Sequence, residues 1–377
     1  MVEELISLGA VFLAVLIAPV ISKRTGLPVI VLEVSLGILL GKSFLDVIVY
    51  ESWLDFLADF GLIYLLFLVG IEVGVRRPSS RGLLMAAFSL VPSFALGYLT
   101  GHAIGVDPFL LGTLLCTTSI GAVAPVLRET PINRALRRFI LESLLVVDAF
   151  SMVLLAVALG VGAGTPPYML VLSILLAFSM FLIPIAFKKF RIGRRIAEWS
   201  KDKTHLEYEV RMCIALVVFF ALIFELFGFH GMLGAFLAGL IVSEITERGS
   251  ALEKRLVSFG YGFFIPIFFI VVGAAANVWV LVELESLLLL LLFVVVAFSG
   301  KVLGMVIAGK LLGYAGKVSA AIGVLHATTL TIILAGAKVG LEMNLLSEVV
   351  YSAILVFALI TVPVSYTHLT LPTTERV

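Results

Sequence analysis

The stretch LLVVDAFSMVLLAVALGV, residues 144–161, holds a single ionisable residue, Asp148, in an otherwise apolar run. A helix needs about 20 apolar residues to cross ~30 Å of hydrocarbon, and the apolar character extends back to residue 139. A carboxylate in hydrocarbon is costly unless a buried partner neutralises it or a function retains it. The stretch therefore predicts a membrane-spanning helix with a functional carboxylate.

The composition of the chain agrees with a lipid solvent. Its 377 residues are 61% hydrophobic and 14% charged, which leaves too little polar surface for a water-soluble fold. A net charge of +1 gives no basis for binding nucleic acid. Cys116 and Cys213 fall in apolar runs, so we expect small buried side chains rather than a disulfide. The acidic start of the chain argues against a cleavable signal peptide.

Apolar runs of spanning length recur along the chain. Thirteen spans are predicted, at residues 5–21, 28–45, 53–73, 83–105, 109–127, 139–161, 168–187, 210–227, 231–245, 256–275, 280–308, 318–339 and 346–364. The predicted fold class is thus an all-α integral membrane protein.

The positive charges predict the orientation of these spans. All but four of the 26 lysines and arginines lie in loops on one side, the exceptions being Lys42, Lys301, Lys338 and Arg376. Positively charged loops remain in the cytoplasm. The pattern predicts a multi-pass protein of the inner membrane with its N-terminus outside and its C-terminus in the cytoplasm.

Short patterns recur in the same order in the two halves of the chain. The matched segments are 33–41 with 235–242, 64–70 with 267–273, and 116–119 with 327–331. Chance similarity among apolar helices would explain any one match. Together they predict two six-helix repeats, residues 1–162 and 207–364, joined by a linker helix at 166–187. An offset of seven spans makes the repeats inverted, which is typical of transporters.

Two predicted spans carry hydroxyl residues at mid-depth. The fifth span contains Thr117, Thr118 and Ser119, and the twelfth contains Thr328 and Thr329. One such threonine would simply bond back to its own helix. Matching pairs in both halves predict that both spans are interrupted and form part of a site, because unwound backbone in a membrane must find partners or line a wet cavity.

Other polar side chains in the spans are candidates for the same site. Ser151 lies one turn after Asp148 on the same helix face. Lys301, in the eleventh span, either snorkels to the cytoplasmic surface or pairs with an acidic group in the core. Glu142 lies near the cytoplasmic start of the sixth span, where helix-start electrostatics and an accessory role explain it equally well.

At these residues the chain resembles the monovalent cation:proton antiporter-2 family, which includes Kef-type potassium efflux proteins and sodium/proton exchangers. The resemblance covers residues 1–364 and rests on GLP at 26–28, LGILLG at 36–41, FLVGIE at 67–72, Thr118-Ser119, Asp148, FIPIFFIVVG at 264–273 and KVLG at 301–304. It implies that Asp148 binds cation and proton alternately. It further implies that Lys301, with Thr328 and Thr329, faces Asp148 at the crossing of the broken helices, and that the protein is a homodimer.

Two departures from the family pattern bear on mechanism. Val147 stands where the family usually has Asp, Asn or Gln. Since electrogenic members use two adjacent aspartates, Val147 predicts one-for-one exchange. In the twelfth span, HATTL at 326–330 replaces the Arg-Gly-Glu of Kef-like members, which weakens the inference of potassium transport.

The prediction is a monovalent cation/proton antiporter rather than an enzyme, working by alternating access with one buried carboxylate. Asp148 would give sodium or potassium a hard oxygen ligand, with hydroxyls of Thr117, Thr118, Ser119 and Ser151 completing the shell. Protonation of the carboxylate would expel the cation. No cofactor is expected, and the partners are the cation, the proton and the bilayer. The alternatives are a Kef-like potassium efflux protein and a membrane sensor or subunit that does not transport.

Residues 365–377 are polar and match none of these patterns. We interpret them as a tail, either an ordinary disordered extension or an artefact of translated adapter sequence.

The orientation can be tested at residues 188–211, which form the longest positively charged loop. Single cysteines placed there are expected to resist a membrane-impermeant maleimide in intact cells and to react in inside-out vesicles. Labelling from outside would reverse the predicted topology.

Overall fold

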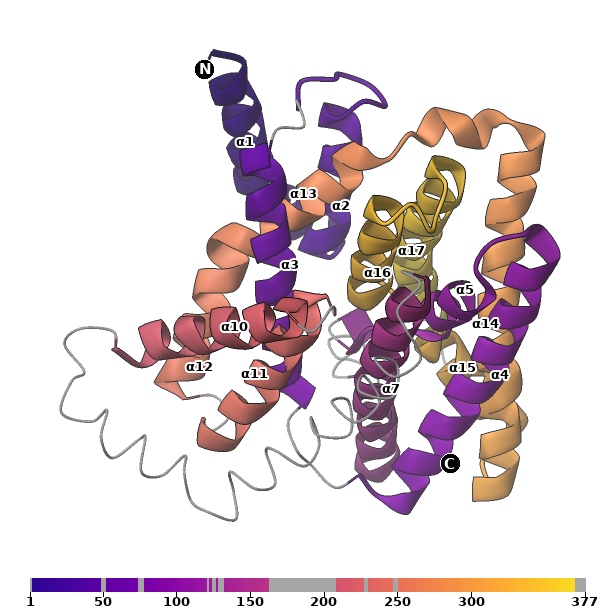
Figure 1. Cartoon of the computed structure of the whole chain (residues 1–377). Helices are drawn as coiled ribbons and strands as arrows, with labels where there is room; N and C mark the ends of the chain where they lie inside the picture. The colour runs from indigo at the N-terminus through magenta and orange to yellow at the C-terminus, as the bar shows by residue number, and fades with distance from the viewer. Residues whose placement is uncertain are drawn as a thin grey trace. The chain divides into compact units, whose positions relative to one another are not determined.

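The computed structural model describes residues 2–48, 52–73, 78–120, 122–123, 127, 132–162, 208–226, 230–246 and 250–369. In these ranges every regular element is a helix (Figure 1), which confirms the all-α class. Six described helices are long and apolar enough to cross a membrane, or seven if one bent pair counts as one span. The predicted span 168–187 and residues 188–207 of the positive loop lie outside the described residues. The count of thirteen remains a prediction.

The described helices divide into two compact units. The first unit contains α1 (Val2–Thr25), α2 (Val29–Leu40), α3 (Ser52–Val73), α10 (Tyr208–Leu226), α11 (Gly231–Ile245), α12 (Ala251–Phe259), the π-helical turn η2 (Gly260–Phe264) and α13 (Ile265–Ala275). The second contains α4 (Ser80–Ile104), α5 (Pro108–Cys116), α7 (Arg134–Gly162), the 3-10 turn η3 (Val278–Val282), α14 (Leu284–Leu312), α15 (Gly316–His326), α16 (Thr331–Glu342) and α17 (Glu348–Leu369). Each unit takes helices from both predicted repeats, so the packing units cross the repeat boundaries.

The last helix passes the predicted boundary at residue 364. α17 continues to Leu369, because residues 365–369 contain no glycine or proline to end it. The segment interpreted as a tail therefore begins inside a helix, and residues 370–377 lie outside the described part.

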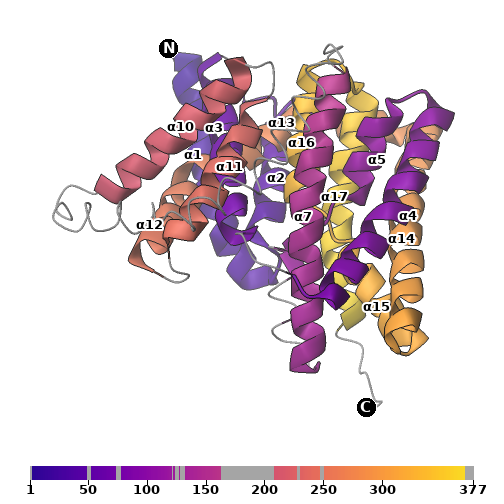
Figure 2. The same cartoon turned by 60° about the horizontal axis from the view of Figure 1, so that its bottom comes forward.

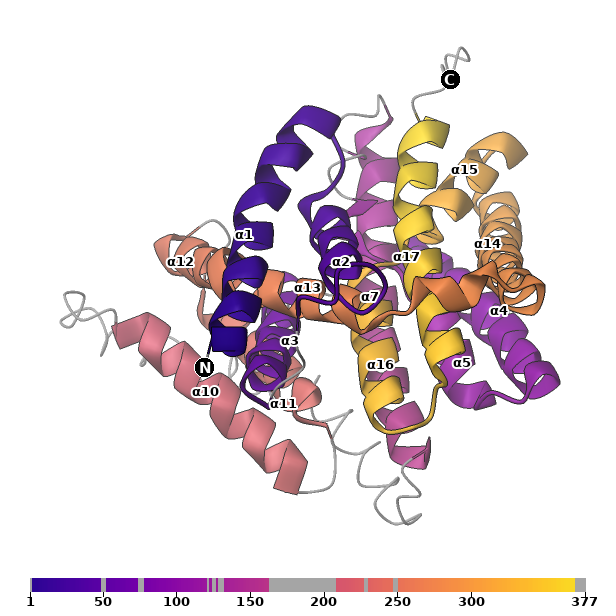
Figure 3. The same cartoon turned by 90° about the horizontal axis from the view of Figure 1, so that it is seen from above.

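In the first unit, α2 packs against α13 at a contact that only glycine permits (Figure 3). A Cβ at Gly37 would overlap the carbonyl oxygen of Ile270, and a Cβ at Gly273 would overlap that of Val34. Such small residues let helix backbones approach closely, which is how helices in lipid gain packing energy.

The packing of α3 on α11 repeats this arrangement. A Cβ at Gly239 would overlap the carbonyl oxygen of Phe67, and a Cβ at Gly70 would overlap that of Phe236. The sequence patterns match Gly37 to Gly239 and Gly70 to Gly273, and their contact residues correspond in the same register, with 34 matched to 236 and 67 to 270. Two glycine-mediated contacts between four helices are therefore related residue by residue.

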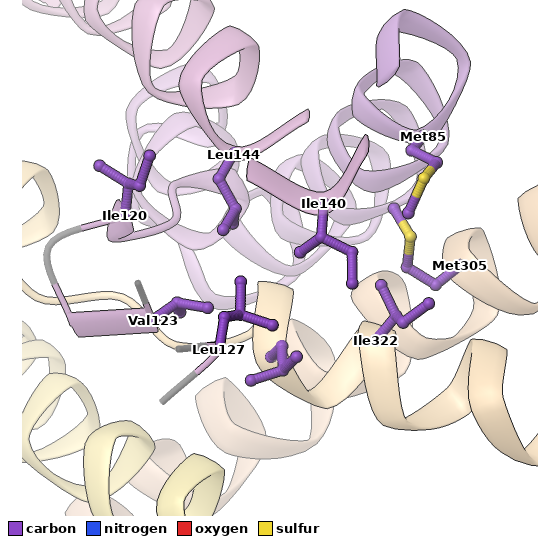
Figure 4. Close-up of a cluster of buried hydrophobic side chains, with 9 residues drawn as sticks. Met85, Ile120, Val123, Leu127, Ile140, Leu144, Met305 and Ile322 are labelled. Carbon is purple, nitrogen blue, oxygen red and sulfur yellow. The ribbon is translucent and has the colours of Figure 1, made fainter. Parts of the chain in front are cut away.

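In the second unit, α4 lies against α5, α7 and α14 (Figure 2). A Cβ at Gly304 of α14 would overlap the Phe88 carbonyl oxygen of α4, so these two backbones also touch. Side chains from α4, α7, α14, α15 and the segment after α5 form one buried cluster (Figure 4): Met85, Ile120, Val123, Leu127, Ile140, Leu144, Met305, Ile322 and Leu325. This cluster fixes the first half of α7 against its neighbours and so positions Asp148 further along the same helix.

The glycine contacts predict that an added methyl group destabilises the protein at a tightly packed glycine and not at a glycine with open space around it. Gly239→Ala should lower the unfolding free energy by about 1–3 kcal/mol, because neither backbone can move freely to accept the new atom. Gly9→Ala is the matched control, since no atom lies within 4 Å of a Cβ there. Thermal unfolding of both variants in one detergent measures the difference, and equal melting temperatures would contradict the close packing.

Candidate functional site

The fifth predicted span is interrupted, as the sequence indicated. α5 starts at Pro108, where the Asp107 carboxylate accepts the Leu110 N–H at 2.7 Å, and it ends after nine residues at Cys116. Thr117 has an extended backbone, and residues 117–119 are not helical. Residues 117–119 thus interrupt the helix in a fully buried environment, and in the described ranges only their Thr117 N–H and Ser119 carbonyl are joined to the helical turns on either side.

The twelfth predicted span is also broken, and the two breaks meet within the second unit. α15 ends at His326 and α16 begins at Thr331, with a bend of 42° between them. Thr117 Oγ1 and Thr329 Oγ1 lie 2.6 Å apart. Because the Thr117 hydroxyl donates to the Leu114 carbonyl at 2.8 Å, the Thr329 hydroxyl is the donor between the two threonines.

Asp148 of α7 turns both carboxylate oxygens toward the first break. Its exposed fraction is 2%. The Thr118 hydroxyl donates to Oδ1 at 2.7 Å, and the Ile120 N–H donates to Oδ2 at 3.4 Å. Both oxygens of the buried carboxylate are therefore held by groups of the segment that follows α5.

Two further predicted hydroxyls are buried at this site. Ser119 Oγ finds no hydrogen-bond partner among the described residues. Ser151 Oγ, one turn after Asp148, lies beside the Cys116 thiol and finds no oxygen or nitrogen partner in the same ranges. Leaving a buried polar atom unpaired costs free energy. Both hydroxyls therefore retain hydrogen-bonding capacity, Ser119 next to Thr118 in sequence and Ser151 one turn after Asp148.

Lys301 of α14 is fully buried, so the snorkelling alternative is wrong. Its ammonium donates to the Cys116 carbonyl oxygen, the last of α5, and to Ser89 Oγ of α4 at 3.3 Å. A cation at the C-terminal end of a half-helix offsets the partial negative charge of the exposed carbonyl groups there. The structure thus brings the predicted charge partner to the first break.

Glu142, predicted as an accessory residue, has a different set of partners. Its carboxylate accepts from the backbone N–H and the hydroxyl of Ser79, which caps α4, and from Arg138 Nε at 2.7 Å. These bonds join the starts of α4 and α7. These contacts explain Glu142 by its interactions at the start of a helix, which is one of the two explanations that the sequence left open.

Several polar groups around the breaks were missed by the sequence reasoning. Ser143 Oγ of α7 and His326 Nε2 of α15 lie 2.8 Å apart, and Thr361 of α17 bonds to the backbone of Thr329. Thr328 is buried beside Thr329, as expected for the crossing. Single Ser, Thr and His residues in apolar helices carry no periodic signal. One sequence signal could have indicated Thr361. It follows Thr329 by 32 residues, which is close to the 30 residues that separate Thr118 from Asp148.

Comparisons with known proteins identify the family of the chain. The family described as sodium/hydrogen exchanger, transmembrane, matches residues 11–373, and the chain belongs to that family. The probable Na(+)/H(+) antiporter 3 of Methanocaldococcus jannaschii is 29% identical over 93% of this chain and 92% of its own length. The Na(+)/H(+)-K(+) antiporter GerN of Bacillus cereus is 26% identical over 95% and 93%.

A solved structure shares the fold. The sodium proton antiporter MjNhaP1 of Methanocaldococcus jannaschii superposes with a TM-score of 0.72 over 97% of this chain and 96% of its own, at 15% identity. The family match confirms that the chain is a multi-pass cation:proton antiporter of the exchanger family. It also runs to residue 373, into the segment interpreted as a tail.

Proposed function

We propose that this antiporter exchanges a monovalent cation, sodium or potassium, for protons by alternating access, with Asp148 as the shared ligand. The main support for the proposal is the environment of the Asp148 side chain. A buried carboxylate faces an unwound segment, and two buried hydroxyls of nearby residues, Ser119 next to Thr118 and Ser151 one turn after Asp148, have no oxygen or nitrogen partner in the described residues.

The chemistry follows from competition at one carboxylate. Ionised Asp148 supplies a hard oxygen ligand of the kind that small cations prefer, and nearby hydroxyls and freed carbonyl groups replace their hydration water. A proton on the same carboxylate removes its charge and with it the affinity for the cation. Since the two ligands exclude each other, each passage of the site across the membrane carries one or the other.

The scaffold proposed for this cycle is a pair of inverted six-helix repeats within thirteen spans. The reciprocal glycine contacts support it, because Gly37 and Gly239, and Gly70 and Gly273, meet corresponding carbonyl groups. We further propose an inner-membrane location, an N-terminus outside, a cytoplasmic C-terminus and a homodimer. The charge pattern supports the orientation, and the family resemblance supports the dimer.

Potassium is the second candidate substrate beside sodium. GerN, a relative over nearly its whole length, is named a Na(+)/H(+)-K(+) antiporter. The Thr118 hydroxyl bonds directly to Asp148, and the hydroxyls of Ser119 and Ser151 belong to neighbouring residues. Such a shell offers oxygen to either ion.

Replacing the carboxylate tests the proposal directly. Asp148→Asn should abolish cation-dependent proton flux in proteoliposomes that carry a pH-sensitive dye, because an amide neither titrates nor attracts a cation. The variant should fold, since the amide keeps the shape and can still accept from Thr118. Asp107→Asn, which retains the α5 cap, is the matched control and should exchange normally. Retained flux in Asp148→Asn would refute the mechanism.

The charge carried per cycle is a second test. Val147, next to Asp148, is fully buried and adds no second carboxylate. A site of charge −1 becomes neutral with either a proton or a monovalent cation, so one-for-one exchange should generate no current on a solid-supported membrane. Lys301 could add a proton by releasing its own when the cation arrives. A current that reverses with the cation gradient and persists in Lys301→Ala would refute electroneutral exchange, and one lost in that variant would assign the extra proton to Lys301.

A further inference from the structure

The second break, between the end of α15 and the start of α16, is hydrogen-bonded to a side chain that has no part in the proposed exchange mechanism. Thr361 of α17 is fully buried. Its hydroxyl oxygen accepts the Thr329 N–H at 3.2 Å and lies 3.0 Å from the Thr329 carbonyl oxygen. The Ala358 carbonyl oxygen, in its own helix, lies 2.8 Å away, so one hydroxyl proton serves two acceptors. The contact with Thr329 thus exceeds the usual back-bonding of a helical threonine.

The accepted bond matters most to the break. Residues 328–330 have no regular structure between α15 and α16, and the Thr329 N–H makes no bond within either helix. Within the described residues, Thr361 Oγ1 is the acceptor that the Thr329 N–H finds. A buried N–H without an acceptor is strongly disfavoured, and more so where no water reaches it. Thr361 therefore determines how the Thr329 peptide is turned.

The orientation of the Thr329 peptide is linked to Asp148 through the hydroxyl groups of three threonines. Thr329 donates to Thr117, which is fixed in turn by its bond to the Leu114 carbonyl. Thr117 is followed directly by Thr118, whose hydroxyl donates to Asp148 Oδ1 at 2.7 Å. Rotation of the Thr329 peptide would thus displace the first break and the donor on the carboxylate.

Thr361 and Asp148 have similar roles in the two halves. Asp148 lies in the long helix that follows the first break, 30 residues after its partner Thr118. Thr361 lies in the long helix that follows the second break, 32 residues after Thr329. Each accepts a backbone N–H from its own break, from Ile120 in the first case. The spacings to the donated N–H differ, 28 residues from Ile120 to Asp148 and 32 from Thr329 to Thr361, so a neutral hydroxyl has a similar role in the second half without the same register.

We propose that Thr361 is a positioning residue for exchange, which holds the second break so that Thr118 stays aimed at Asp148. The proposal rests on the proposed role of Asp148 as cation ligand. Thr361 touches neither cation nor proton, so its loss should weaken cation binding more than it slows turnover.

The test is a sodium titration of proton flux in proteoliposomes. Thr361→Val, which removes the hydroxyl at nearly constant volume, should raise the apparent KM for sodium about tenfold, as expected for one hydrogen bond lost from a charged site. Thr361→Ser should stay within about twofold of the wild type. Thr113→Val is the matched control, because the buried Thr113 hydroxyl bonds to Phe109 in its own helix at 2.8 Å, and its KM should not change.

A double-mutant cycle separates positioning from general destabilisation. If Thr361 acts by aiming the Thr329 hydroxyl, Thr361→Val should add little to the KM of Thr329→Val. Strict additivity of the two changes, or a wild-type KM in Thr361→Val, would overturn the proposal. If Thr361→Val does not accumulate in membranes, Thr361→Ser and Thr361→Ala replace it, since they differ in the hydroxyl alone, and equal KM values would overturn the proposal.

The same experiment distinguishes this proposal from the role of Asp148. Asp148→Asn is assayed in parallel. Flux retained in Asp148→Asn would remove the proposed function on which the positioning role rests. An inactive Asp148→Asn beside a Thr361→Val of wild-type KM would leave Asp148 in place and refute only the role of Thr361.

Discussion

Hydrocarbon offers no hydrogen-bond partner to a peptide group, and the second unit of this protein is organised around that constraint. Two helices stop inside an apolar environment and release backbone groups that must be satisfied by the protein itself. At the first break, Lys301 meets the last carbonyl of α5 and Asp148 meets the Ile120 N–H. At the second break, the neutral hydroxyl of Thr361 bonds to both the N–H and the carbonyl oxygen of Thr329.

The same constraint explains why function collects at these breaks. A continuous helix would leave no free carbonyl or N–H to a cation, whereas a break provides polar groups that are fixed in direction before any ion arrives. Asp148 adds a charge that can be titrated, and Lys301 adds a charge of the opposite sign beside it. The remaining helices need only apolar contacts, and glycine contacts such as that of Gly304 with Phe88 bring their backbones together.

Much of this arrangement follows from the sequence by local rules. Apolar runs located the helices, and paired hydroxyls located both breaks, because each signal lies within one segment. The division into units could not be predicted this way, since α2 packs on α13 and α3 packs on α11, and the two members of each pair are far apart in sequence. Glu142 was ambiguous because its partner Ser79 lies 63 residues away in sequence. Thr361 was missed for the same reason, as its partner is 32 residues distant and a lone threonine is unremarkable in an apolar helix.

The central claim is that one buried carboxylate binds either a cation or a proton. Calorimetric titration of sodium into the detergent-solubilised protein, in two buffers of different ionisation enthalpy, counts the protons released for each ion bound. At a pH where the empty site is protonated, the account predicts about one proton per sodium ion in the wild type and no binding heat in Asp148→Asn. Sodium binding without proton release, at every pH where exchange occurs, would contradict it.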